Sequence, residues 1–324
     1  MSVLIFTEAL ATTGLGHLTR CTALAEILQS YGHDVLLVLD SDGTASVAKD
    51  SPPLLECHWK IAENLMALLN EQKPTLCFVD SYLADFAVYE QIQSHCKKLI
   101  CIDDDKRIDY PKGSTILNPS LAGKELDYDT QNHEIQTGIE YVLLRAPFRE
   151  DFTPKPIAEK ISSILVTVGG EDRWNIVPQI TEFLSKEYAD CEKYIIVGPA
   201  FNNLAEIEKV CDAKTKILKN LSAIEMRDLM LKVDVAITGG GQTTYELVRC
   251  GVPMIVLKIA ENQSGNIHGL IDLKLIKSFC STVHNNVVAF VASEMNRLTG
   301  SLEKSRARIP DPQTFGSGSG YRNL

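Results

Sequence analysis

A glycine-rich run near the N-terminus ends in a histidine that could act as a base. Gly14 and Gly16 belong to the run TTGLGH (residues 12–17), which follows an apolar run and precedes a stretch with helical periodicity. Two glycines let backbone amides approach a ligand closely, and the start of a helix favours anionic groups. Thr19 stands where the dinucleotide pattern GxGxxG has its third glycine, which disfavours NAD binding. His17 is therefore a candidate general base, with a capping or packing histidine as the alternative.

A second glycine-rich run is suited to a nucleoside diphosphate. The run TGGGQTTYE (residues 238–246) follows an apolar segment and opens a helical stretch. Its backbone amides can hold a diphosphate, and a carboxylate in the first helical turn can accept hydrogen bonds from two ribose hydroxyls. The alternative for that carboxylate is that it only complements the helix dipole. The candidate binding residues of this run are Gly240, Gly241, Gln242, Thr243 and Glu246.

Two more segments at predicted strand ends carry groups that can bind a ligand. Gly169 and Gly170 form a turn that either approaches a ligand or is a simple tight turn. The amides of Asn262 and Gln263, in the segment 261–263, can bind phosphate or sugar hydroxyls; the alternative is that the segment caps the helix that follows. All four residues are therefore candidates for substrate binding.

Acidic residues end two other predicted strands. Asp80 and Tyr82 are two residues apart, so their side chains can face the same ligand. Asp103–Asp105 is an acidic triplet, but consecutive side chains on an extended chain point in different directions, so solvated or capping roles are expected for most of it. The sequence also lacks HxxxH, HExxH, CxxC and Walker lysine patterns. We predict no metal site and no cofactor.

Short apolar runs alternate with amphipathic stretches, which predicts buried parallel strands connected by helices. In doubly wound sheets, ligands bind outside the carboxyl ends of the strands, and the runs described above lie there. We predict an α/β fold with two doubly wound, Rossmann-like domains that face a cleft. The predicted strands cover residues 3–6, 35–39, 76–79, 99–102, 164–168, 194–197, 217–218, 235–238 and 254–257, and the predicted helices include 18–28 and 61–69.

The alternation is interrupted once, between residues 110 and 161. This region holds two short apolar runs, at 115–117 and 141–144, and then a polar stretch with two prolines at 149–160 that is typical of an interdomain linker. We predict domains at 1–150 and 161–304, followed by a Pro-, Gly- and Ser-rich tail at 305–324 that is ordered only if it packs on the body.

Composition and charge narrow the class of protein. The chain has 324 residues, 45% of them hydrophobic and 23% charged, which is typical of a globular protein, and its net charge of −10 disfavours nucleic-acid binding. No apolar run approaches the ~18 residues of a membrane span, and the start has no basic region of a secretory signal. We expect a cytoplasmic protein without stable membrane insertion. The nine cysteines are expected to be reduced thiols.

Eight segments of the chain occur, in the same order, in the PseG family, the UDP-sugar hydrolases of pseudaminic acid biosynthesis. The resemblance runs from about residue 1 to 285, and the spore-coat polysaccharide protein SpsG is similar too. The family resembles the MurG-type glycosyltransferases, which have a two-domain GT-B fold. The segments are GLGHLTRCTALAEIL (14–28), VDSYL (79–83), IDDD (102–105), LNPS (117–120), GIEYVLLRAPF (138–148), VTVGGEDRWN (166–175), TGGGQTTYEL (238–247) and AENQ (260–263).

The resemblance implies that the second domain holds UDP and that the sugar faces the first. It implies metal-independent hydrolysis of UDP-2,4-diacetamido-2,4,6-trideoxy-β-L-altropyranose to the free sugar and UDP. By this resemblance His17 matches the catalytic histidine, Tyr82 a cleft tyrosine and Asn262 a residue close to the reacting sugar. The turn at 240–243 and Glu246 match the UDP site.

The chain departs from the family pattern at three places. Family members commonly carry Arg and Asp after the first strand, where this chain has Phe6, Thr7 and Glu8, and this departure bears on the identity of the sugar. Gln242 stands where Ser is usual and Tyr245 where Trp is usual, and neither changes how a nucleotide-binding turn works.

We therefore predict a UDP-sugar hydrolase in which His17 is the general base for water attack at the anomeric carbon. Loop amides and a helix N-terminus would stabilise the leaving UDP in place of a metal ion. One alternative is a glycosyltransferase, in which His17 deprotonates an acceptor hydroxyl, although the first half shows no basic and apolar membrane patch. The other alternative is a nucleotide-sugar-binding protein without turnover. The predicted partner is the UDP-sugar, and no protein partner is predicted.

Overall fold

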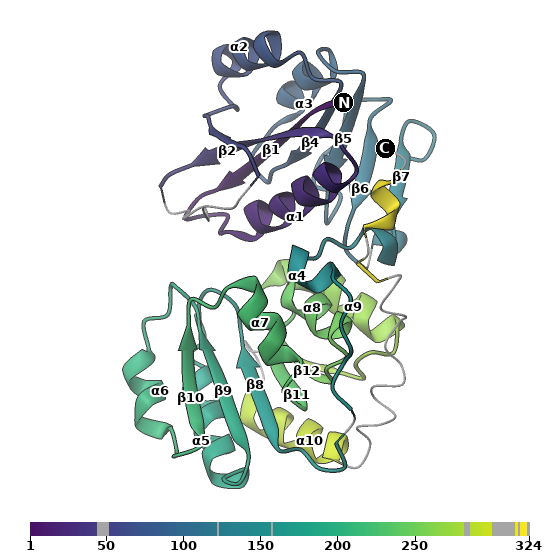
Figure 1. Ribbon diagram of the computed structural model, residues 1–324. Helices are drawn as coiled ribbons and strands as arrows, with labels where there is room; N and C mark the ends of the chain where they lie inside the picture. The colour runs from purple at the N-terminus through teal and green to yellow at the C-terminus, as the bar shows by residue number, and fades with distance from the viewer. Residues whose placement is uncertain are drawn as a thin grey trace. The chain divides into compact units, whose positions relative to one another are not determined.

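The computed structural model describes residues 1–43, 52–121, 123–156, 158–281, 286–299, 315–316 and 318–322. The chain divides into two compact units, the first made of residues 1–146 and 313–324 and the second of residues 147–312. Each unit is built on one sheet with helices on its faces (Figure 1). The predicted α/β class with two Rossmann-like units is confirmed.

The first unit contains a seven-stranded parallel sheet in the order β3-β2-β1-β4-β5-β6-β7. The chain moves outward in one direction from β1 to β3 and in the other direction from β4 to β7, so the strand order reverses between β1 and β4. Ligands bind at the carboxyl ends beside such a reversal. The strands are β1 (Ser2–Ala9), β2 (Asp34–Ser41), β3 (Leu54–Glu56), β4 (Leu76–Asp80), β5 (Lys98–Ile102), β6 (Thr115–Asn118) and β7 (Glu134–Thr137).

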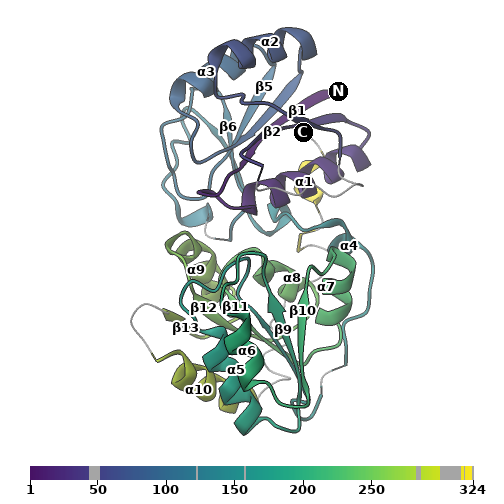
Figure 2. The same ribbon diagram turned by 90° about the vertical axis from the view of Figure 1, so that its left-hand side faces the viewer.

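Both faces of this sheet are apolar because the strands alternate between two buried cores. Val3 and Ile5 of β1 join the core under α1 (Gly16–Ser30), whereas Leu4 and Phe6 join the core under α2 (Ala62–Gln72) and α3 (Phe86–Gln93). Figure 2 shows α2 and α3 on the face opposite α1. The helical periodicity predicted over 18–28 is confirmed, and the helix extends two residues further at each end.

The last described residues belong to the first unit. The hydroxyl of Tyr321 donates to the carbonyl of Tyr141 at 2.7 Å, and the hydroxyl of Tyr31 donates to the carbonyl of Gly318 at 3.2 Å. Tyr321 is fully buried in the core under α1. The described part of the predicted tail therefore packs on the first unit, whereas residues 305–314, 317 and 323–324 lie outside the described residues.

The second unit contains a six-stranded parallel sheet in the order β10-β9-β8-β11-β12-β13, with its reversal between β8 and β11. Helices α5 (Val177–Glu187), α6 (Leu204–Val210) and α10 (Val287–Thr299) share one core with the strands. Figure 2 shows α7 (Ala223–Met230) and α8 (Thr243–Arg249) on the other side of the sheet. The strands are β8 (Ser163–Thr167), β9 (Glu192–Val197), β10 (Thr215–Lys219), β11 (Val235–Gly239), β12 (Met254–Lys258) and β13 (Phe279–Ser281).

The segment predicted as a linker, 149–160, is attached to the second unit where it is described. Lys155 Nζ lies 2.5 Å from Oδ1 of Asp234, whose carboxylate also accepts from the backbone N–H of Ser163 at 3.0 Å. The Arg249 guanidinium lies 4.2 Å from the ring centroid of Phe152, a cation–π distance. These contacts explain why the boundary between the compact units falls before this segment.

Candidate functional site

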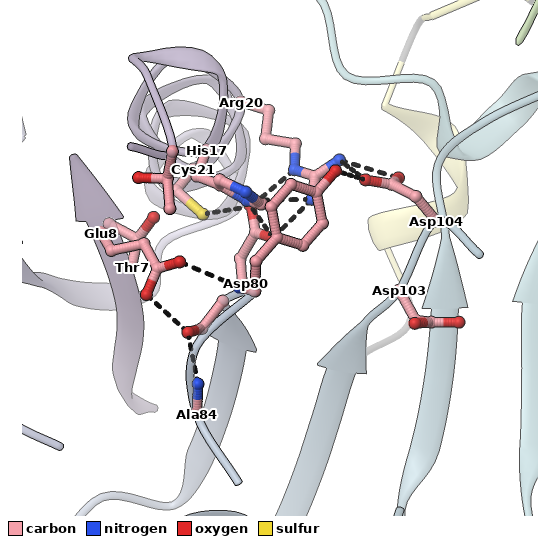
Figure 3. Close-up of polar contacts among 12 residues, drawn as sticks. Thr7, Glu8, His17, Arg20, Cys21, Asp80, Ala84, Asp103 and Asp104 are labelled. Atoms are coloured by element: carbon pink, nitrogen blue, oxygen red, sulfur yellow. Dashed lines mark hydrogen bonds and ion pairs between the residues drawn. The ribbon is translucent and has the colours of Figure 1, made fainter. Parts of the chain in front are cut away.

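His17 and Asp80 form a buried pair at the strand reversal of the first unit. His17 lies in the first turn of α1, and Asp80 is the last residue of β4. The Nδ1 atom of His17 is 2.7 Å from Oδ1 of Asp80, and both side chains are buried. Figure 3 shows the two side chains in contact. Because Nδ1 is engaged by a carboxylate, Nε2 is the ring nitrogen left for proton transfer.

Arg20 holds the Asp80 carboxylate from a second side. Arg20 Nε donates to Oδ2 of Asp80 and Arg20 Nη2 donates to Oδ1, both at 2.5 Å, in a two-point arrangement. Cys21 Sγ also approaches Oδ2, at 3.3 Å. Burial alone would raise the pKa of Asp80, but the charges of Arg20 and His17 outweigh it and hold that pKa well below its usual range. Asp80 is therefore a carboxylate at neutral pH.

Asp104 and Tyr82 complete this network. Arg20 Nη1 donates to both carboxylate oxygens of Asp104, at 2.8 and 2.7 Å, and the Tyr82 hydroxyl donates to Oδ2 of Asp104 at 3.2 Å. The Tyr82 ring meets the His17 ring edge-on, with 4.2 Å between centroids. The structure thus brings together His17 and Tyr82, both predicted, with Arg20 and Asp104, which sequence reasoning missed.

The other two acidic residues of the triplet differ from Asp104. Asp103 is buried and accepts hydrogen bonds from the backbone N–H groups of Lys106 and Arg107 at 2.7 and 3.1 Å, which is a turn-capping role. Burial and the charges of its two acidic neighbours raise the pKa of Asp105. Among the described residues, no three His, Cys, Asp or Glu side chains are arranged as a metal site.

Gly14 and Gly16 line the approach to α1. Gly14 has φ of +72°, which an L-residue adopts only with strain, and its N–H donates to the carbonyl of Leu10 at 2.8 Å. Both glycines are exposed, and no atom lies within 4 Å of the place where a Cβ would stand. The turn therefore leaves open space beside the His17 helix, as ligand binding requires.

Glu8, at the position that departs from the family pattern, is fully buried behind Tyr82. It accepts hydrogen bonds from the Ser81 hydroxyl at 2.6 Å and from the backbone N–H of Tyr82 at 2.9 Å. Lys60 Nζ lies 2.9 Å from Glu8 and 2.7 Å from Asp40, so it bridges the two carboxylates. Glu8 thus fixes the turn that carries Tyr82.

The glycine-rich turn of the second unit is held by side chains from the loop and helix after β12. Gly240 N–H donates to Gln263 Oε1 at 3.1 Å, and the same oxygen accepts from Ile259 N–H at 3.1 Å. Asn266 Nδ2 donates to the carbonyl of Gly240 at 2.6 Å and to Thr244 Oγ1 at 2.9 Å. Gln263, predicted as a binding residue, therefore uses its carbonyl oxygen to shape the turn. Asn266 was not predicted.

Gly240 and Gly241 of this turn differ in how much space surrounds the position of a Cβ. A Cβ on Gly240 would lie 2.6 Å from two side-chain carbons of Ile267, whereas a Cβ on Gly241 would meet only Gln263 Nε2, at 3.7 Å. Gly240 is thus required by packing against α9 (Ser264–Asp272), and Gly241 is the one with room for an approaching ligand. Gln242 occupies the N-cap position of α8 without a side-chain cap.

The remaining predicted binding residues lie near the carboxyl edge of the second sheet. Glu246 is in the first turn of α8, as predicted, and is buried. Asn262 is exposed in a short 3₁₀ turn after β12. Gly169 and Gly170 follow β8, are exposed and have open space where a Cβ would stand. Binding of a ligand by these residues, and by Thr243, stays a prediction.

Several known proteins are similar to this chain in sequence, although no family model matches it. It is 25% identical to the uncharacterized protein MJ1062 of Methanocaldococcus jannaschii over 79% of this chain and 55% of that protein. It is 24% identical to the Helicobacter pylori protein named pseudaminic acid cytidylyltransferase and UDP-2,4-diacetamido-2,4,6-trideoxy-β-L-altropyranose hydrolase, over 81% of this chain and 45% of that protein. It is 25% identical to the Bacillus subtilis spore coat polysaccharide biosynthesis protein SpsG, over 82% of this chain and 79% of that protein.

These relatives confirm the predicted resemblance to PseG and SpsG. The alignments span only about half the length of the first two relatives, 55% and 45%, so each of those proteins contains a further part.

Solved structures with the same fold include glycosyltransferases and an epimerase. The glycosyltransferase of kitacinnamycin matches with a TM-score of 0.67 at 16% identity, over 99% of this chain and 96% of that one. MurG of Acinetobacter baumannii matches with a TM-score of 0.59 at 16% identity, over 99% of this chain and 97% of that one. The UDP-GlcNAc 2-epimerase of Neisseria meningitidis matches with a TM-score of 0.61 at 14% identity, also over 99% of this chain and 97% of that one. The chain therefore has the predicted GT-B-like fold.

Within the described residues, no helix has the length and apolar character needed to cross a membrane.

Proposed function

We propose that this PseG- and SpsG-like protein hydrolyses a UDP-sugar to UDP and the free sugar. UDP-2,4-diacetamido-2,4,6-trideoxy-β-L-altropyranose, or a close analogue, is the proposed substrate, because the name of the Helicobacter pylori relative includes hydrolysis of that compound. The single observation that carries the proposal is the buried His17–Asp80 pair at the strand reversal of the first unit.

The proposed step is attack by water on the anomeric carbon. His17 Nε2 accepts one proton from the water while its oxygen bonds to that carbon, and the bond from the carbon to the β-phosphate oxygen breaks. The bonding electron pair leaves with UDP. Asp80 holds the ring in the required orientation and stabilises the positive charge that His17 gains. Tyr82, packed against the His17 ring, limits the other orientations of that ring.

The second unit is assigned to UDP in this proposal. The amides of Gly241, Gln242 and Thr243 would hold the diphosphate, since the Gly240 N–H already donates to Gln263, and their fixed dipoles would stabilise the negative charge that develops on it. Gln263 and Asn266 hold this turn in place before any ligand binds, which reduces the cost of reorganisation. Glu246, one turn inside α8, would accept hydrogen bonds from the ribose hydroxyls.

The same His17–Asp80 pair could deprotonate the hydroxyl of a sugar acceptor, and glycosyltransferases are among the proteins with this fold. A panel of UDP-sugars, incubated with and without acceptor sugars in H₂¹⁸O, separates the candidates. Hydrolysis predicts UDP release without acceptor and ¹⁸O in the sugar, not in UDP. A glycosyltransferase would release UDP only with an acceptor, and a binding protein would release none.

A further inference from the structure

Trp174 is an exposed aromatic ring that is nevertheless fixed in place. It lies in the turn after β8 and keeps 40% of its surface exposed, whereas the other tryptophan, Trp59, is fully buried. The indole Nε1–H of Trp174 donates to the carbonyl of Ile259 at 2.9 Å, so the ring bridges from the end of β8 to the end of β12. Its polar edge is satisfied, and its apolar surface is left for contact.

The turn that carries Trp174 is held by hydrogen bonds to a buried side chain. Asp172 accepts hydrogen bonds from the backbone N–H groups of Ile176 and Val177, at 3.0 and 2.9 Å. Asn203 Nδ2 donates to Asp172 at 2.8 Å from the following strand-to-helix connection. A ring held in this way loses little conformational entropy when a ligand packs on it.

Hydrogen bonds connect Trp174 to the glycine-rich turn through two residues. Ile259 accepts from the Trp174 indole with its carbonyl and donates its N–H to Gln263 Oε1. The same Gln263 oxygen accepts from Gly240 N–H. Trp174 is thus joined to the turn from the β12 end, whereas Glu246 lies on the helix that leaves the turn.

We propose that Trp174 is the platform on which the sugar of the UDP-sugar stacks; this inference rests on the proposed function. If the ribose is at Glu246 and the diphosphate is at the turn, the group beyond the diphosphate extends toward the β12 end. Trp174 is held at that end. The flat indole packs best against a sugar face made of C–H groups, so it selects deoxy and N-acetylated hexoses, which carry fewer hydroxyls and extra methyl groups.

The test compares affinities for UDP and for the UDP-sugar. Calorimetric titrations use UDP and UDP-2,4-diacetamido-2,4,6-trideoxy-β-L-altropyranose, with His17→Asn as the background so that the sugar is not released. Trp174→Ala should weaken binding of the UDP-sugar roughly tenfold and leave UDP binding unchanged, as expected for loss of one aromatic contact. Trp174→Phe, which keeps an aromatic face, should retain most of the affinity for the UDP-sugar.

Tryptophan fluorescence gives a second readout, since the chain has only two tryptophans. The UDP-sugar should change the emission of the His17→Asn protein and UDP should change it much less. Trp174→Phe should remove that change, while Trp59 remains as an internal reference. An equal loss of affinity for UDP and the UDP-sugar in Trp174→Ala would place the nucleotide, not the sugar, on the ring and overturn the inference. So would unchanged affinities for both.

A different result would contradict the proposed function: release of no UDP by the wild-type protein from any UDP-sugar in the absence of acceptor. The affinity difference between UDP and the UDP-sugar is measured once the His17→Asn protein is shown to release no UDP, so it tests the role of Trp174 separately from that assay.

Discussion

His17 Nδ1 lies 2.7 Å from Asp80 Oδ1, and Arg20 Nη2 approaches the same Asp80 oxygen at 2.5 Å. A carboxylate shared in this way cannot leave His17 without also breaking its contacts with Arg20. The histidine is therefore positioned by Asp80 of β4 and, through Asp80, by Arg20 of α1, all contained in the first unit.

Replacing His17 with Asn should abolish turnover and leave UDP affinity nearly unchanged. The base belongs to the first unit, whereas the proposed UDP-binding turn belongs to the second. Loss of general-base catalysis costs about 10²–10⁴-fold in rate. Steady-state UDP release and calorimetric titration with UDP check the two halves of this prediction. Near-wild-type turnover of the variant would rule out His17 as the base.

Replacing Asp80 with Asn should reduce both turnover and stability. Removing one partner of a buried ion pair costs about 3–5 kcal/mol, and the low end is expected because Asp104 still pairs with Arg20. The folded pKa of Asp80 lies below its unfolded value of about 3.9. The carboxylate thus stabilises the fold above about pH 4, and this contribution is lost as pH falls through the folded pKa. Urea unfolding at pH 7 and pH 3 checks this: the free energy of unfolding should fall less between the two pH values in the variant than in the wild type.

The sequence predicted most central strands and the edge strand β10, showed β6 only as a short apolar run at 115–117, and missed the other three edge strands. β3, β7 and β13 end their sheets, are three or four residues long and are partly exposed, so they carry no apolar run to recognise. The central strands are buried on both faces, which makes their runs continuous.

The candidate site was predictable where strand ends carry unusual residues, and not where a helix contributes a common one. His17 and Tyr82 stand out because they follow a glycine run and a strand. Arg20 resembles any arginine on a helix surface, although its place three residues after His17 puts it on the same face. Its link between Asp80 and Asp104 arises only when the ends of β4 and β5 meet α1.

Activity should persist in EDTA. The proposed leaving group is stabilised by backbone dipoles, and Asp103 and Asp104 are already engaged by backbone amides and by Arg20. UDP release measured in EDTA and in added Mg²⁺ or Mn²⁺ should give rates within about twofold of each other. A strict requirement for either ion would show that the acidic triplet binds metal.

Two glycine substitutions in one turn should act differently. Gly240→Ala places a Cβ 2.6 Å from Ile267 carbons, so it should lower the free energy of unfolding by about 1–3 kcal/mol through overpacking. In Gly241→Ala the added Cβ lies 3.7 Å from Gln263 Nε2, an ordinary contact distance, so stability should be nearly unchanged. UDP binding should weaken if the diphosphate binds beside Gly241. Thermal unfolding and UDP titration of the pair check both points. Equal UDP affinity in Gly241→Ala and the wild type would move the diphosphate away from this turn.

Replacing Glu246 with Ala should weaken UDP binding far more than it slows the chemical step. A carboxylate that accepts from two ribose hydroxyls makes charge-assisted hydrogen bonds worth about 1.5–3 kcal/mol, or roughly 10–150-fold in affinity. The contact exists in both the ground state and the transition state, so KM should rise while kcat changes little.

Glu246→Gln is the matched control, because it keeps the size and an accepting oxygen and should lose less affinity than Ala. If Glu246 only complements the dipole of α8, the Ala variant should bind UDP normally and lose about 0.3–1 kcal/mol of stability. Calorimetric titration with UDP together with thermal unfolding decides between these roles, and unchanged affinity with a lowered Tm would remove Glu246 from the UDP site.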